Sequence, residues 1–272
     1  QVQYDGLNIR VPIVGQLLTT ETAFVEIVYH GVPQIDPTGW GGFYFEGPIA
    51  YNLGVGFGAD PHNLGKTWFP CVDDFIDKAS YDYYIITSQG NMAVCSGVLI
   101  DSYPVDSVNT VYEWRMEQEI PTYLASVAVG PYSKVHYDYT GIQGIIPADI
   151  YVTNSYVNNV QGSFINLEGA LDAFEYRFGE YVWPRIGYIG TSIGAMEHQC
   201  NIAFPNFLIN GTTSGETTMA HELGHSWFGN LITAASAGDM WINEGWASYT
   251  EYIFMEEVHG KEAAKEYIRS QH

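Results

Sequence analysis

The sequence predicts an α+β protein in which an all-β half precedes a half that mixes helices with strands. Up to about residue 135, short stretches of β-type residues, several of them alternating, are separated by Gly, Pro, Asp and Asn clusters, and no helical period stands out. Beyond that point, apolar residues recur at steps of three and four, which is typical of amphipathic helices. With 272 residues, 46% of them hydrophobic, the chain can bury one large core or two ordinary ones.

The first half contains four stretches rich in β-branched and aromatic residues, and these are the predicted strands: Thr22–Tyr29, Tyr81–Thr87, Ala93–Ile100 and Thr110–Glu119. The segment Gly41–Gly65 is rich in Gly and aromatic residues, so it is predicted to be an irregular connection.

The second half should begin with an amphipathic helix at Ser163–Phe178, because its Phe and Leu residues share one helical face. A strand at Arg185–Ile193 is expected next. Three more helices are expected after it: Glu216–Phe228, Ile242–His259, and one that starts at Lys261 and runs to His272.

Composition excludes several classes of function. The chain has 10 Lys and Arg against 31 Asp and Glu, a formal charge of −21, and no basic patch that could neutralise phosphates, so nucleic-acid binding is not expected. No apolar run reaches the length of a membrane span, so no transmembrane segment is expected. Cys71, Cys95 and Cys200 are too few for a disulfide framework and leave their redox state open.

The most informative motif is His221-Glu222-Leu223-Gly224-His225, followed after eighteen residues by Glu244. Residues four apart lie on one face of a helix, so His221 and His225 can bind one metal ion. Two His and one Glu leave a fourth position open, as in catalytic rather than structural zinc sites. Glu222, between the two His, is placed to accept a proton from water. By chance this whole pattern would arise in roughly 0.1% of such chains.

With a second motif, Gly194-Ala195-Met196-Glu197, the sequence resembles the zinc aminopeptidases of the aminopeptidase N family, a gluzincin group. This second motif is similar to the family's Gly-x-Met-Glu-Asn exopeptidase motif. Three further stretches also resemble the family, in the right order along the chain: Thr67–Asp73, Pro121–Ser126 and Asp239–Gly245.

The resemblance implies one zinc ion bound by His221, His225 and Glu244, with Glu222 as the general base. It also implies that Glu197 binds the free α-amine of a peptide substrate, while the backbone of Gly194 and Ala195 pairs with the substrate main chain. Without its neighbours in the motif, Glu197 would be an ordinary surface or capping carboxylate.

In terms of fold, the resemblance implies a saddle- or sandwich-like β domain at 1–138 and a thermolysin-like α/β zinc domain at 139–272. It further implies that β-strands precede Gln1 and that a helical domain and an oxyanion-stabilising Tyr follow His272. On that basis the chain is expected to be a fragment that binds zinc and turns over slowly. The resemblance also favours an exported enzyme, either periplasmic or secreted.

One position departs from the family pattern, because His198 stands where the family has Asn. Its ring could support the neighbouring chain, or it could join the amine site. The function has alternatives too: a thermolysin-like endopeptidase, which shares the zinc motif, an epoxide hydrolase of the same family, or a zinc- or peptide-binding fragment without appreciable turnover.

Overall fold

The N-terminal unit of the chain is small and exposed. The computed structural model describes residues 2–13, 15, 17–60 and 62–271 and contains two compact units, Gln1–Val32 and Pro33–His272. The first unit holds one hairpin, β1 (Gln3–Tyr4) and β2 (Ile9–Arg10). Thr22–Tyr29 forms no strand, so that prediction was wrong. A segment of alternating apolar and polar residues forms a stable strand when one of its faces is buried. The described side chains of this unit are all exposed, so Thr22–Tyr29 has no such face.

The second unit begins with two antiparallel sheets, ordered β3-β4-β9-β6 and β5-β8-β7. The indole nitrogen of Trp114 donates a hydrogen bond of 3.0 Å to the carbonyl of Ala93 and so joins the two sheets. The strands are β3 (Gly42–Glu46), β4 (Ile49–Leu53), β5 (Lys78–Ser88), β6 (Met92–Cys95), β7 (Val98–Pro104), β8 (Asn109–Pro121) and β9 (Val127–Gly130).

Two predictions for this region need correction. The segment Gly41–Gly65 is not wholly irregular, because its first part is the β3–β4 hairpin. Gly47 and Pro48 form the two-residue turn of this hairpin, with Gly47 at a φ of 56°. The predicted strand Ala93–Ile100 divides into β6 and β7, because Gly97 has a φ of 83° and cannot continue a strand.

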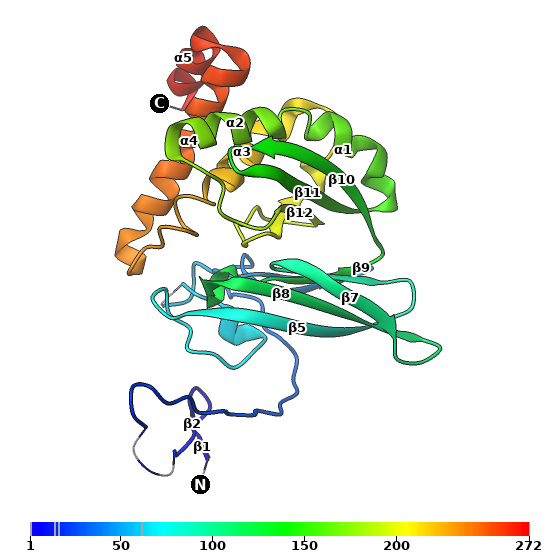
Figure 1. The fold of residues 1–272 in the computed structure, drawn as a ribbon, viewed down its shortest axis with the longest axis vertical. Coiled ribbons are helices and arrows are strands. Elements are labelled where there is room, and N and C mark those ends of the chain that lie inside the picture. The colour runs from blue at the N-terminus through cyan, green and yellow to red at the C-terminus, as the bar shows by residue number, and fades with distance from the viewer. Residues whose placement is uncertain (1, 14, 16, 61, 272) are drawn as a thin grey trace. The chain divides into compact units, whose positions relative to one another are not determined.

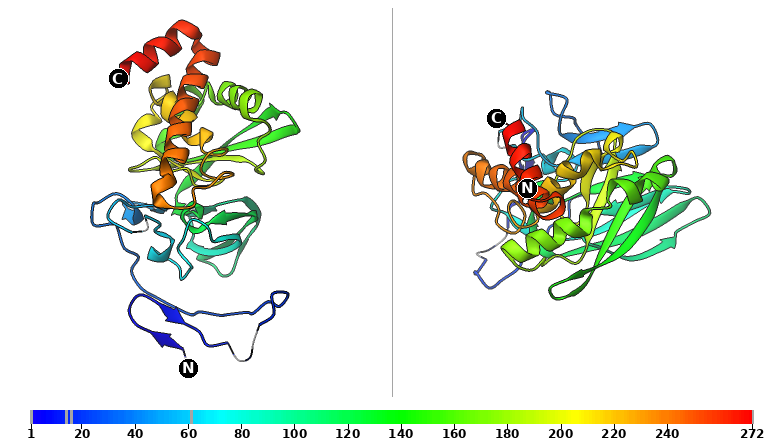
Figure 2. Two further views of the ribbon diagram at one scale, coloured as in Figure 1. Left: turned by 90° about the vertical axis from the view of Figure 1, so that its left-hand side faces the viewer. Right: turned by 90° about the horizontal axis from the view of Figure 1, so that it is seen from above.

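The rest of the unit is an α/β layer built on one sheet, ordered β10-β11-β12-β13, in which only the β10–β11 pair is antiparallel. Helices α1 and α2 cover one face of this sheet (Figure 1), and α4 packs against α2 and α3 (Figure 2). The elements are β10 (Tyr132–Gly141), β11 (Gly144–Thr153), α1 (Val157–Ser163), α2 (Leu167–Phe178), β12 (Ile186–Thr191), β13 (Ile202–Pro205), α3 (Glu216–Gly224), α4 (Met240–His259) and α5 (Lys261–Ser270).

The predicted helices exist, with different ends. The expected helix Ser163–Phe178 is α2 preceded by the separate α1, and α3 ends at Gly224 rather than at Phe228. Helix α5 ends at Ser270, and Gln271 is a turn residue, so the prediction that the helix continues past Ser270 was wrong. His272 lies outside the described residues.

Sheet membership changes between Gly130 and Tyr132, and the predicted domain boundary after residue 138 falls within β10. That boundary stays a prediction.

His198 connects the two parts of this unit. Its Nε2 accepts a hydrogen bond of 3.0 Å from the backbone N–H of Gly54, directly after β4, and the ring is fully buried. Because Nε2 is the acceptor, Nδ1 carries the proton of a neutral imidazole. Of the two roles considered for His198, this contact is the supporting one.

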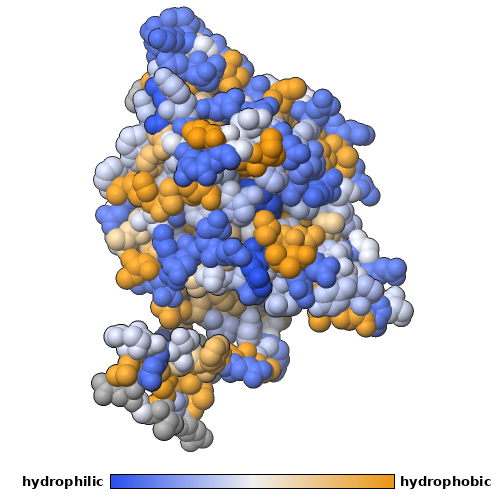
Figure 3. Space-filling model, viewed as in Figure 1, coloured by the Kyte–Doolittle hydropathy of each residue, from blue (hydrophilic) through white to orange (hydrophobic). Residues whose placement is uncertain are grey.

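The described surface is mixed in character. On the face seen in Figure 3, apolar residues form separate small patches between polar ones. No helix in the described part of the chain is long and apolar enough to cross a membrane. Cys71, Cys95 and Cys200 are free thiols.

We expect Gly54→Ala to destabilise the fold by about 1–3 kcal/mol, because the new methyl carbon would lie 1.7 Å from the carbonyl oxygen of Tyr123. Urea unfolding would measure the loss. Gly31→Ala is the matched control, since nothing lies within 4 Å of a methyl group there. Equal stability of the two variants would contradict this account of Gly54.

Burial lowers the pKa of His198 to about 3. The imidazole of the unfolded chain titrates near 6.5, so between these values the unfolded state binds the extra proton and stability falls as the pH falls. Between pH 7 and pH 5, the free energy of unfolding of the metal-free protein should fall by about 2 kcal/mol more than that of His198→Asn, whose amide can still accept from Gly54. Urea unfolding at both pH values measures the two changes. An equal change in the two proteins would refute this account.

Candidate active site

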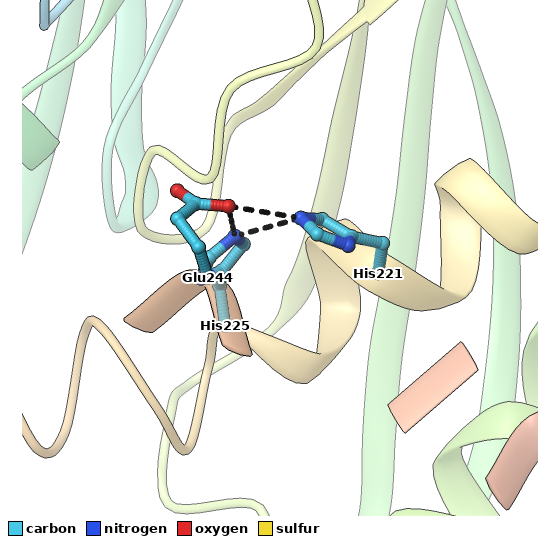
Figure 4. Close-up of side chains that lie close together, drawn as sticks. All are labelled: His221, His225 and Glu244. Carbon is cyan, nitrogen blue, oxygen red and sulfur yellow. Dashed lines mark hydrogen bonds and ion pairs between the residues drawn. The ribbon is translucent and has the colours of Figure 1, made fainter. Parts of the chain in front are cut away.

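Helices α3 and α4 bring the three predicted ligands together. The Nε2 atoms of His221 and His225 lie 3.2 Å apart. One carboxylate oxygen of Glu244 lies 3.4 Å from the first nitrogen and 3.7 Å from the second. Figure 4 shows the three side chains converging from the two helices.

The opposite nitrogen of each ring is held by an acceptor. Nδ1 of His221 lies 2.6 Å from a carboxylate oxygen of Glu251, and Nδ1 of His225 lies 3.0 Å from the carbonyl oxygen of Phe228. Neither oxygen can donate, so in each neutral ring Nδ1 carries the proton and Nε2 presents its lone pair. Two lone pairs and a carboxylate oxygen thus face one point.

This arrangement fits a tetrahedral metal ion. Zinc–ligand bonds of about 2.0–2.2 Å place neighbouring donor atoms about 3.3 Å apart, close to the observed separations. The point also attracts positive charge without a metal. Burial lowers the pKa of the His221 imidazole, but its hydrogen bonds to Glu244 and Glu251 outweigh burial and raise that pKa to about 10. A proton therefore substitutes for the cation in the metal-free protein.

Glu222 lies beside this point without being one of the three converging donors. Its side chain is buried, and its Oε2 has no hydrogen-bond partner among the described residues. Burial raises the pKa of Glu222 to about 8, opposed by His221 and reinforced by Glu244 and Glu251. A carboxylate with a free oxygen and a pKa near neutrality can take up and release a proton.

Glu197 reaches the same place from the segment between β12 and β13. One carboxylate oxygen of Glu197, one of Glu222 and one ring nitrogen of His225 all lie within 4.8 Å of one another. Burial, followed by repulsion from Glu244 and Glu222, raises the pKa of Glu197 well above its usual value. None of the ion pairs found among the described residues includes Glu197, so no cationic side chain balances the charge of its ionised carboxylate.

The chain before Glu197 presents a free backbone edge. Among the described residues, neither Gly194 nor Ala195 takes part in a backbone hydrogen bond, whereas Met196 pairs with Ala203 of β13. Gly194 has a φ of 76°, and a side chain there would press on Leu53 of β4 at 2.7 Å. Glycine is therefore required, and the half-buried edge remains open to an extended ligand.

Sequence reasoning missed several supporting residues. Glu251 follows Glu244 by seven residues on α4, which places it on the same helix face, so this signal was available. Asn230, whose amide donates 2.9 Å to the backbone carbonyl of Glu197, had no such signal. Tyr249 and Tyr252 of α4 stack on each other with ring centroids 5.8 Å apart.

Comparison with known proteins indicates a family for this chain. Residues 164–272 match the peptidase family M1 domain. Aminopeptidase B of Rattus norvegicus is 30% identical over 192 residues, which are 69% of this chain and 28% of that protein. Aminopeptidase N of Mus musculus is 30% identical over 203 residues, 68% of this chain and 21% of that protein. The chain thus spans less than a third of the length of these relatives.

Solved structures show the same fold. The M1 zinc metallopeptidase from Deinococcus radiodurans matches 89% of this chain and 55% of its own with a TM-score of 0.74 and 22% identity. Native yeast LTA4 hydrolase matches 80% of this chain and 33% of its own with a TM-score of 0.66 and 24% identity. On the family match, the two relatives and this shared α+β fold, the chain belongs to peptidase family M1.

Proposed function

We propose that this chain is the zinc-binding part of an aminopeptidase, which hydrolyses the first peptide bond of peptides that have a free N-terminus. The observation that supports this most is the placement of Glu197. A buried carboxylate without an ion-pair partner lies beside a three-donor metal site, with one of its oxygens within 4.8 Å of ligand atoms of Glu222 and His225.

In this proposal His221, His225 and Glu244 hold one zinc ion. The donor separations and the two Nδ1 hydrogen bonds support that role. When bound, zinc would supply Lewis acidity towards the scissile carbonyl and lower the pKa of a water molecule. Half of the Glu244 side chain is exposed, so water and substrate can reach this side of the site.

Glu222 is the proposed general base. It would take the proton of the attacking water on its free oxygen and pass it to the leaving amine. Its pKa of about 8 in the metal-free protein would fall beside a divalent cation, because opposite charge favours the ionised form.

Glu197 is the proposed anchor for the substrate α-amine. A terminal ammonium would supply the positive charge that this buried carboxylate lacks, through a charge-assisted hydrogen bond. The open backbone of Gly194 and Ala195 would pair with the substrate main chain as an edge strand does. Anchoring the amine at a fixed distance from the metal brings only the first peptide bond to the reacting atoms.

We expect the chain to bind one zinc ion, measured by elemental analysis after dialysis against a low concentration of chelator. His225→Ala should lose the metal, because two remaining donors hold zinc much more weakly than three. His136→Ala is the matched control, since that exposed histidine lies on β10 and contacts Asp149 instead. Zinc retained by His225→Ala would refute the ligand assignment.

Glu222→Gln should bind zinc normally and lower kcat about 10²- to 10⁴-fold, because an amide cannot accept the proton. The assay is hydrolysis of an aminoacyl anilide by the zinc-loaded chain. Activity near that of the unmodified protein would exclude Glu222 as the base.

Glu197→Ala should reduce the preference for a free N-terminus over an N-acetylated one about 10- to 100-fold, the size of a charge-assisted hydrogen bond. The preference is measured as a ratio of kcat/KM values. Calorimetric binding of a tripeptide and its N-acetylated form to Glu222→Gln gives the same comparison without turnover. Equal handling of both peptides by the unmodified chain would favour the endopeptidase instead.

A further inference from the structure

The carboxylate of Glu251 is held from both sides. One oxygen accepts from Nδ1 of His221 at 2.6 Å, and the other accepts a short hydrogen bond from the hydroxyl of Tyr267. His221 lies on α3, Glu251 on α4 and Tyr267 on α5. Together they form a chain of hydrogen bonds, the relay, that ends at the His221 ring of the proposed metal site. Tyr267 itself is not one of the three proposed metal ligands.

The position of Tyr267 follows from the packing of α5. Gly260, at a φ of 87°, ends α4 and lets the chain turn into α5. Ala264 is fully buried, and Tyr267 follows it by three residues, so both lie on one face of α5. That face is the one that α5 packs against α4, where Glu251 lies.

The relay borders solvent, so the Tyr267 hydroxyl can keep water away from Glu251. A pocket of about 320 Å³ is lined by His221, Glu251 and Tyr267 together with Glu222, Thr217 and Thr218. Water in this pocket would compete for the second oxygen of Glu251 and let the carboxylate rotate about its side-chain bonds. A hydroxyl fixed to a helix removes that freedom, because both oxygens are then bound to protein groups.

We propose that Tyr267 is a positioning residue for the metal site: its hydroxyl fixes Glu251, and Glu251 fixes the His221 ring with Nε2 towards the metal. The proposal rests on the zinc-binding role of His221 in the proposed function. Through this relay, the docking of α5 contributes to metal affinity although α5 provides no metal ligand.

The test measures zinc affinity by competition with a chromophoric chelator. Glu251→Ala should weaken zinc binding about 10- to 100-fold, as expected for the loss of a group that orients a metal ligand. Tyr267→Phe, which removes only the hydroxyl, should weaken it about 3- to 10-fold. Tyr252→Phe is the matched control, because that half-buried tyrosine lies on α4 and its hydroxyl makes no hydrogen bond among the described residues; its zinc affinity should be unchanged.

The double variant separates positioning from general packing. If Tyr267 acts through Glu251, then Tyr267→Phe combined with Glu251→Ala should bind zinc no more weakly than Glu251→Ala alone. Multiplied effects, or an unchanged affinity of Tyr267→Phe, would overturn the proposal. The comparison still holds if Tyr267→Phe lowers the melting temperature, because loss of packing would weaken binding further in the double variant. Failure of the unmodified chain to bind zinc would refute the proposed function itself.

Discussion

The active-site geometry depends on where two histidine protons are held. If Nδ1 of His221 or His225 were not bound to an acceptor, each ring could take either tautomer, and the Nε2 lone pairs would not have to face each other at 3.2 Å. Glu251 and the carbonyl of Phe228 remove that choice. Two lone pairs directed at one point repel each other unless a cation lies between them, so this geometry favours a positive charge at that point, which a proton on His221 provides in the metal-free protein.

The β part of the unit contributes to the site through packing and uncharged hydrogen bonds rather than through charged groups. Gly54, at the end of β4, lies between the carbonyl of Tyr123 and the ring of His198, and Leu53 packs against Gly194. The hydroxyl of Tyr123 in turn donates 3.2 Å to the carbonyl of Gly229, in the turn that follows the metal-site helix. The segment that carries Glu197 is therefore fixed from the β side, and the distance between Glu197 and the metal point is set by contacts between the two parts of the unit.

The sequence predicted the convergence of His221, His225 and Glu244 better than it predicted the strands, for a physical reason. The spacing of His221 and His225 is a property of one helix, and eighteen residues allow Glu244 to return on a second helix, so local geometry fixes the convergence. Strand pairing depends on distant partners. Thr22–Tyr29 has a strand-like composition but no buried face. The β3–β4 hairpin lies in a glycine-rich segment, and glycine is typical of loops, so its strands were not predicted. Tyr267 and Asn230 reach the site only through tertiary packing, so no local pattern points to them.

The balance of charge links the metal to the choice of substrate. Glu197, Glu222 and Glu244 all belong to the groups that surround the metal point. Ionised together, they would carry three negative charges in a largely buried space, which burial and mutual repulsion oppose by raising the pKa of Glu197 and Glu222. A zinc ion would balance two of those charges, and the ammonium of a free N-terminus would balance the third. A peptide with a blocked N-terminus would leave Glu197 buried without a counter-charge. On the proposed assignment, selection of the free amine therefore comes from the same excess of carboxylates that selects a divalent metal.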